Sequence, residues 1–372
     1  MKNIRRIILF SAFLFPSFCF SQNLSDYNSK YNGALYQLYF NRQPSARAEA
    51  LGGGLVAGTE ADFGSYYNPA LTSLGKGIIF NASKTSLGKH YYDGDESANG
   101  YIGIIYSGSS IGSFSLSRYN YGRGITEDKG DKNHNSIHTL NYSRELGAGF
   151  YAGANVNLVH MGYLNANQNS WFFGETPDDF KSSDAFTLDL GILSKADFGN
   201  NSTDNHIHSF QFGASLLNVT NSKIRNKNYD DKFEVLPMII RVGMSFLNQF
   251  YDESVKNRNI FQSFTSLEFE GVFNADNLKK IRLGEEFVLA DLLVLRAGVV
   301  FGAAKYNNES YSTYAKDEPQ YTFGFGIKDP LKKIINKDFP VSFSIDYSPS
   351  VPSAKYRERF TSLSVNINYI PD

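Results

Sequence analysis

The chain has 372 residues, a length that allows two soluble domains or one large β-domain. Its 36 basic and 37 acidic side chains leave a formal net charge of -1, so no basic excess points to nucleic acid and no acidic tail is present. Aromatic residues make up 15% of the chain and the mean hydropathy is -0.32, which excludes a bundle of membrane helices.

The first residues have the features of a secretory signal. A basic stretch from Lys2 to Arg6 precedes the apolar run 7–20. We expect a signal peptide over residues 1–21, because the run is short for a membrane anchor. The residue before Cys19 is large where a lipoprotein signal has a small one, so lipidation is not expected. Without this signal the chain has no cysteine, and therefore no disulfide and no thiol chemistry.

The next segment, residues 22–76, holds small residues and short apolar runs but no long alternation. Gly52, Gly53 and Gly54 approach the dinucleotide-binding fingerprint, which needs a buried strand before it and a helix after it. Polar-rich sequence precedes these glycines instead, so we expect no cofactor.

From residue 77 onwards, segments of about ten residues alternate apolar and polar side chains, as β-strands with two different faces do. Each is close to the roughly 9–11 residues that cross a bilayer as a tilted strand, and an even number is expected of a single-chain bacterial barrel. The fourteen predicted strands are 78–86, 97–107, 112–120, 136–144, 150–160, 185–195, 208–218, 236–247, 263–273, 281–289, 293–302, 320–328, 339–347 and 360–369.

The connections between these strands alternate in length, as in barrels with long extracellular loops and short periplasmic turns. With both termini in the periplasm, the outward loops are 87–96, 121–135, 161–184, 219–235, 274–280, 303–319 and 348–359. Connections 196–207, 248–262 and 329–338 depart from this asymmetry. Trp171, Phe172 and Phe173 are either aromatic anchors for a partner or part of an interfacial girdle.

The apolar run 287–304 is also long enough to suggest a membrane helix. Asp291 and Arg296 would each cost about 2.5–3.5 kcal/mol near the centre of such a helix. Two strands joined at 290–292 place Asp291 in a turn and Arg296 inside, so we predict a hairpin.

A soluble β-sandwich is the alternative architecture, since alternation alone does not require lipid. The polar faces, however, carry charges of both signs that in a barrel line the lumen and can pair there. These are Asp189, Arg241, Glu268, Glu270, Arg282, Glu286, Arg296 and Asp346. They favour an all-β fold, a 14-stranded antiparallel transmembrane β-barrel over residues 77–372, located in the outer membrane.

No catalytic constellation is apparent. Gly108 to Gly112 matches G-x-S-x-G, but it joins two strands, whereas a nucleophile elbow joins a strand to a helix. The six histidines have no cysteine and no clear third ligand beside them, so we expect no metal. Neighbouring carboxylates on a strand point to opposite faces, so no general acid meets a base, and we expect a protein that is not an enzyme.

Several short motifs follow one another in a recognisable order. Residues 45–53 precede Tyr67-Asn68-Pro69-Ala70, and Gly-ended motifs follow at 188–191, 241–243 and 295–298. Together they resemble the FadL-like outer-membrane barrels, most closely the PorV/PorQ branch of Bacteroidota. The family's fourteen strands agree with the number counted from periodicity. We expect the N-terminal segment, residues 22–76, to fold into the lumen as a plug, because its Gly and Ala residues permit close packing there. Its signature residues here are Gly52, Gly53, Gly54, Asn68, Pro69 and Ala70.

The resemblance also implies a function. PorV-like proteins serve type IX secretion, so the chain is expected to be a non-enzymatic accessory subunit of an envelope secretion or assembly complex. Its partners would be other outer-membrane or envelope proteins and membrane lipid. The alternative is a FadL-type transporter that passes hydrophobic small molecules through the barrel wall. Tyr67 stands where the PorV signature has Trp, and the chain does not end in an aromatic residue, which favours a paralogue over PorV itself.

Overall fold

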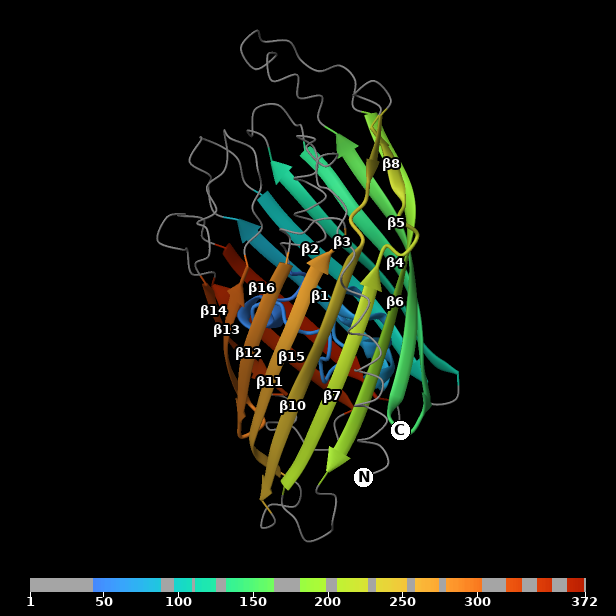
Figure 1. The fold of residues 1–372 in the computed structure, drawn as a ribbon. Coiled ribbons are helices and arrows are strands. Elements are labelled where there is room, and N and C mark those ends of the chain that lie inside the picture. The colour runs from blue at the N-terminus through green and yellow to red at the C-terminus, as the bar shows by residue number, and fades with distance from the viewer. Residues whose placement is uncertain are drawn as a thin grey trace.

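The computed structural model describes residues 43–87, 97–108, 111–124, 132–163, 181–198, 206–226, 232–252, 258–273, 279–302, 319–329, 340–349 and 360–370. Fourteen of its strands form a closed antiparallel barrel in which the first strand pairs with the last (Figure 1). They are β1 (Gly77–Leu87), β2 (Ser97–Gly108), β3 (Gly112–Gly124), β4 (Lys132–Gly147), β5 (Phe150–Tyr163), β6 (Lys181–Phe198), β7 (His206–Leu217), β10 (Ile239–Asp252), β11 (Arg258–Val272), β12 (Lys279–Leu289), β13 (Leu293–Phe301), β14 (Gln320–Lys328), β15 (Val341–Pro349) and β16 (Phe360–Tyr369).

The predicted fold class is confirmed, since each predicted strand overlaps one strand of the barrel. Segments 320–328 and 360–369 agree with β14 and β16 at both ends. β4 and β6 begin four residues before the predicted starts at 136 and 185. These extra residues, such as Lys132 and Lys181, are polar on both faces, so the alternation that predicts a strand is lost there.

A short hairpin of β8 (Lys223–Asn226) and β9 (Lys232–Val235) lies where a loop was predicted, at 219–235. Its four-residue strands are too short to show a period. The hairpin follows β7 and stays beside β6, because the Val219 amide donates to the Leu188 carbonyl at 2.8 Å. Ile224 of β8 is fully buried.

The outer face of the barrel is apolar and the inner face is polar. On β12, Ile281 and Leu283 point outward with exposed fractions of 46% and 39%, while Arg282 and Glu286 point inward at 2% each. A closed barrel satisfies its backbone hydrogen bonds between strands, so this inside-out arrangement fits a bilayer and not a soluble sandwich. The architecture is that of an outer-membrane barrel, as predicted.

The described part of the run 287–304, residues 287–302, does not form a helix. It divides between β12 and β13, and Ala290 and Asp291 both adopt a φ of 52° in the turn between them. Among the residues described, no helix is both long and apolar enough to cross a membrane.

Residues 43–76, named here the inner segment, lie within the ring of strands (Figure 1). They contain α3 (Ala46–Ala50), α4 (Gly64–Tyr67) and the 3-10 helix η4 (Pro69–Leu74). The Ser45 side chain caps α3 by accepting from the Ala48 amide at 3.1 Å. Residues 22–42 of the segment predicted to be a plug, and the predicted signal, residues 1–21, fall outside the described residues, so both stay predictions.

Glycines on the inner face of the wall make room for the inner segment. A Cβ on Gly191 would lie 2.1 Å from Asn68 Oδ1, and one on Gly213 would lie 2.2 Å from the Val56 carbonyl oxygen. Both distances are far below van der Waals contact, so only glycine fits. We call this set the glycine cradle; its members are Gly153, Gly191, Gly213, Gly243, Gly284 and Gly298.

Candidate functional site

An ion-pair network joins the inner segment to one side of the barrel. Arg47 on α3 reaches Glu286 on β12 at 2.9 Å and Glu60 at 2.6 Å. Glu286 also accepts from Arg296 at 2.6 Å, and Arg296 continues to Asp346 at 2.8 Å. Arg296 on β13 therefore links β12 to β15, and the buried Arg47 guanidinium ties the inner segment to this group through Glu286. We call this the Arg47 cluster.

Glu60 extends the Arg47 cluster to β14, because Lys328 Nζ lies 2.6 Å from its carboxylate. Burial alone opposes ionisation of Glu60, but Arg47 and Lys328 outweigh it and hold the pKa of this carboxyl well below its usual range. Burial likewise opposes the charge on Arg47, and the Glu286 and Glu60 carboxylates more than compensate, so its pKa is raised. Both groups therefore stay charged.

A second network, the Arg282 cluster, lies on β10, β11 and β12. Arg282 contacts Glu268 at 2.7 Å and Glu270 at 2.5 Å, and Arg241 contacts Glu270 at 2.6 Å. Glu268 also accepts from the amide of Val56 at 2.8 Å. The guanidinium of Arg241 donates to the Tyr66 carbonyl at 3.0 Å and lies 5.4 Å from the centroid of its ring.

Asp189 on β6 has no basic partner among the described residues and is satisfied by amides. It accepts from Asn155 at 3.0 Å, from Asn157 at 2.7 Å and from the backbone of Asn218 at 2.8 Å. The structure thus places all eight charges singled out from the sequence on the inner face. Seven of them belong to the Arg47 or the Arg282 cluster, and the eighth, Asp189, belongs to neither.

Asn68 is the most highly connected of the signature residues. Its Nδ2 donates to the carbonyls of Val56 and Ile192, both at 2.8 Å. Its Oδ1 accepts from the Ala70 amide at 3.0 Å and so caps η4, in which Pro69 takes the first helical position. No other residue type offers both donors and this acceptor at that length, which explains the Asn-Pro-Ala sequence.

The signature glycines turn the chain after α3. Gly52 and Gly53 have φ values of 69° and 85°, in the left-handed region that favours glycine. Gly54 passes close to β11 and β12, where a Cβ would meet Ser266 Oγ at 3.3 Å. Gly52 and Gly53 therefore allow the backbone to turn, and Gly54 allows it to pass close to the wall. The aromatic residues Trp171, Phe172 and Phe173 lie outside the described residues.

Sequence reasoning missed Arg47, Glu60, Asp62 and Lys328. The two acids and Arg47 lie in a segment without periodicity, so nothing marks their direction. Lys328 could have been predicted to point inward, because it lies two residues after Gly326 and four after Gly324, both inward positions of β14.

One row of the inner wall is apolar. Tyr101, Tyr119, Ile137, Val159 and Ala185 lie directly opposite one another across β2 to β6. All five are buried, with exposed fractions of 6% or less. The next inward row along the same strands, which includes Asn157 and Thr187, is polar. The lumen therefore contains a narrow hydrophobic band, named here the apolar row.

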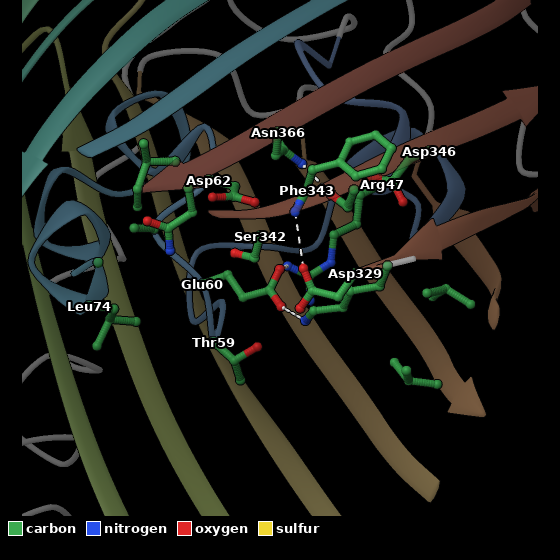
Figure 2. Close-up of a pocket in the computed structure, with 18 of the residues that line it drawn as sticks. Arg47, Thr59, Glu60, Asp62, Leu74, Asp329, Ser342, Phe343, Asp346 and Asn366 are labelled. Carbon is green, nitrogen blue, oxygen red and sulfur yellow. Dashed lines mark hydrogen bonds and ion pairs between the residues drawn. The ribbon is translucent and has the colours of Figure 1, made fainter. Parts of the chain in front are cut away.

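A cavity of about 260 Å³ lies beside the Arg47 cluster (Figure 2). It is at the terminal end of the barrel, the end where β1 begins and β16 ends. Its lining joins residues 59–62 and 74–76 of the inner segment to residues of β1 and of β12 to β16. Figure 2 shows Glu60, Asp62 and Asn366 among the residues around it. Among the described residues, no group of three or more His, Cys, Asp or Glu side chains is arranged to hold a metal.

No protein-family model matches the chain, and no curated protein does. Among solved structures, a FadL homologue from Pseudomonas aeruginosa is 12% identical, with a TM-score of 0.46 over 88% of this chain and 98% of that one. The toluene transporter TodX from Pseudomonas putida is 10% identical, with a TM-score of 0.43 over 87% and 96%. The toluene transporter TbuX from Ralstonia pickettii is 10% identical, with a TM-score of 0.42 over 88% and 98%.

These neighbours are FadL-family outer-membrane barrels. Likeness at this level of identity concerns the overall barrel and carries nothing about ligands. The PorV/PorQ branch, Bacteroidota and type IX secretion are not matched by any of the three, so that part of the resemblance stays a prediction.

Proposed function

We propose that the barrel passes small hydrophobic molecules across the outer membrane, with the inner segment controlling the path. The observation that carries the proposal is the apolar row. A pore for hydrophilic solutes has no use for a hydrophobic band on its inner wall. A hydrophobic solute gains roughly 25 cal/mol for each Å² that it removes from water, so the row offers such a solute a favourable site.

The inner segment lies between this row and the terminal end. Phe63 packs on Tyr101, with ring centroids 4.8 Å apart, and Tyr66 packs on Tyr119 at 5.4 Å. A molecule moving along the row toward the terminal end would meet these two rings. Passage therefore requires the inner segment to shift, and we assign it the role of the gate.

The test is binding of a fluorescent hydrophobic probe, 1-N-phenylnaphthylamine, to the purified barrel in detergent. Val159→Asn buries an amide in the middle of the row, at a cost of about 1–3 kcal/mol if it finds no partner. About tenfold weaker binding is expected, since 1.4 kcal/mol corresponds to tenfold. Thr187→Ser, in the adjacent polar row, is the matched control and should bind as wild type does.

The same proposal predicts that deletion of the gene slows uptake of small hydrophobic compounds into whole cells. Uptake at the wild-type rate, together with equal probe binding by Val159→Asn and Thr187→Ser, would refute it.

An accessory role in a secretion or assembly complex is the second candidate. The observation that favours it is the double anchoring of the inner segment by the Arg47 and Arg282 clusters, which suits a barrel that stays shut. A pull-down of the tagged protein from its native outer membrane in mild detergent, with mass spectrometry, separates the two. Stoichiometric envelope proteins would support the accessory role, whereas a lone barrel that carries lipid would support transport.

A further inference from the structure

The cavity at the terminal end has an unbalanced charge. Three bases, Arg47, Arg296 and Lys328, pair with three acids, Glu60, Glu286 and Asp346. Lys76 and Asp329 also line the cavity, and their opposite formal charges cancel. This leaves Asp62, which forms no hydrogen bond or ion pair with any other residue that the structure describes. When every group is ionised, the lining carries one excess negative charge.

Two of the residues that line the same cavity hold acceptor oxygens without donors. Oδ1 of Asn366 and Oδ1 of Asn368 are both buried and accept no hydrogen bond from the described residues. Asn366 is only 7% exposed, and its Nδ2 donates to Ser344 Oγ at 3.0 Å. This hydrogen bond identifies Oδ1 as the side-chain atom without a hydrogen-bond partner. Because the two asparagines are two residues apart on β16, they share one face of the strand. A buried acceptor without a donor is unfavourable, so this arrangement favours a ligand that donates hydrogen bonds.

The size and the remaining lining of the cavity narrow the class of ligand. A bare metal ion needs far less than about 260 Å³, and the described residues hold no trio of metal-binding side chains. Ile79, Val288 and Val294 line the cavity as well, and each is 2–3% exposed. The site therefore offers one carboxylate, two amide oxygens and an apolar wall.

We propose that this cavity binds a small primary ammonium ion with a short carbon chain. The ammonium group carries three donors and one positive charge, which match Asn366, Asn368 and the excess charge of Asp62. The carbon chain lies against the apolar wall. Two sources supply such an ammonium group, a free amine and the ethanolamine headgroup of a lipid, and both have the same recognition chemistry.

The protonation of Asp62 adds a pH dependence. Burial, followed by the neighbouring Glu60 carboxylate, raises the pKa of Asp62 to about 7. The charged groups facing it are Glu60, Glu286, Asp329, Asp346, Arg47, Lys76, Arg296 and Lys328. An ammonium binds the ionised carboxylate, so binding should strengthen as pH rises through this pKa. The ligand itself stays protonated until about pH 10.

The experiment is calorimetric titration of the full-length barrel in detergent with n-butylamine at about pH 8, where Asp62 is ionised. n-Butanol, which lacks the charge, and tetramethylammonium, which lacks N–H donors, are the ligand controls. Saturable binding of butylamine, at least about tenfold tighter than either control, is expected, since losing a hydrogen bond to a charged group costs about 1.5–3 kcal/mol. Asp62→Asn should weaken it by about the same factor. Glu145→Gln, at an exposed carboxylate near the end of β4, should leave it unchanged.

Three results would overturn the proposal: no saturable binding, equal binding of butanol or tetramethylammonium, or wild-type binding by Asp62→Asn. If Asp62→Asn does not fold, the pH profile of the wild type decides, because flat affinity between about pH 5.5 and 8.5 contradicts a role for this carboxylate. Titration in phosphatidylcholine nanodiscs with and without phosphatidylethanolamine distinguishes the two sources, since a lipid headgroup in the site competes with butylamine. Val159→Asn should not alter butylamine binding, so this test fails or succeeds separately from the transport proposal.

Discussion

Gly191→Ala tests whether the inner segment is held by the glycine cradle. The new Cβ would lie 2.1 Å from Asn68 Oδ1, where ordinary contact begins at 3.4 Å, a shortfall of 3.4 - 2.1 = 1.3 Å. It would also lie 2.7 Å from Pro69 Cδ. Asn68 can retreat only by giving up its bonds to Val56, Ile192 and Ala70, at 2.8, 2.8 and 3.0 Å.

Three hydrogen bonds at about 1 kcal/mol each give an expected loss of about 3 kcal/mol, near the upper end of the 1–3 kcal/mol typical of overpacking. The stability of a folded domain is about 5–15 kcal/mol, so the barrel should fold but unfold at lower urea. The assay is urea unfolding in detergent, followed by heat-modifiable gel migration. Gly100→Ala is the matched control, because its Cβ would have no neighbour nearer than 3.8 Å.

Equal stability of Gly191→Ala and Gly100→Ala would refute the reasoning. The double variant with Asn68→Ala supplies a further check, since removing Oδ1 removes the closest contact. Gly191→Ala should therefore lower the stability less in the Asn68→Ala background than in the wild type, as expected of residues in contact.

Arg47→Met should lower stability by about 3–5 kcal/mol, because it leaves Glu60 and Glu286 buried with one partner fewer, and unfolding in urea measures it. Lys195→Ala breaks an exposed pair and should cost at most about 1 kcal/mol in the same assay, so similar losses for both would contradict the role of the Arg47 cluster. Leu283→Arg places a charge on the outer face near the middle of β12 and should destabilise the barrel in vesicles by about 2–4 kcal/mol. Leu146→Arg, at the end of β4 next to the turn into β5, should cost about 0–1 kcal/mol, and a larger loss than for Leu283→Arg would place the membrane elsewhere on the wall.

The wall could be predicted because its two faces differ. A lipid face and a polar lumen impose a period of two, and this period assigns Asp189, Arg241 and Arg296 to the inside before any strand is paired. What periodicity does not supply is which acid meets which base. Those pairs depend on the register between strands and on the path of the inner segment, and both are set by contacts that are distant in sequence.

The inner segment could be predicted only in part. Small residues indicated close packing, but Arg47 and Asp62 lie in irregular chain where no period gives a direction. The strands also carry a pattern that marks where the inner segment packs, an inward charge followed two residues later by an inward glycine. It occurs at Asp189-Leu190-Gly191, Arg241-Val242-Gly243, Arg282-Leu283-Gly284 and Arg296-Ala297-Gly298, and each of these glycines meets the inner segment.

The position of the inner segment also constrains the order in which the barrel is assembled. Its η4 helix contacts β4 through Asn141, while the Ala50 carbonyl on α3 accepts from Thr322 on β14. One short stretch, made before any strand, therefore bridges early and late strands. The closing pair, Ile78 with Tyr369, brings together residues 369 - 78 = 291 positions apart, and contacts between such distant residues form slowly. We therefore expect the late strands to collect on the inner segment, and the seam between β1 and β16 to be the last part of the wall to form.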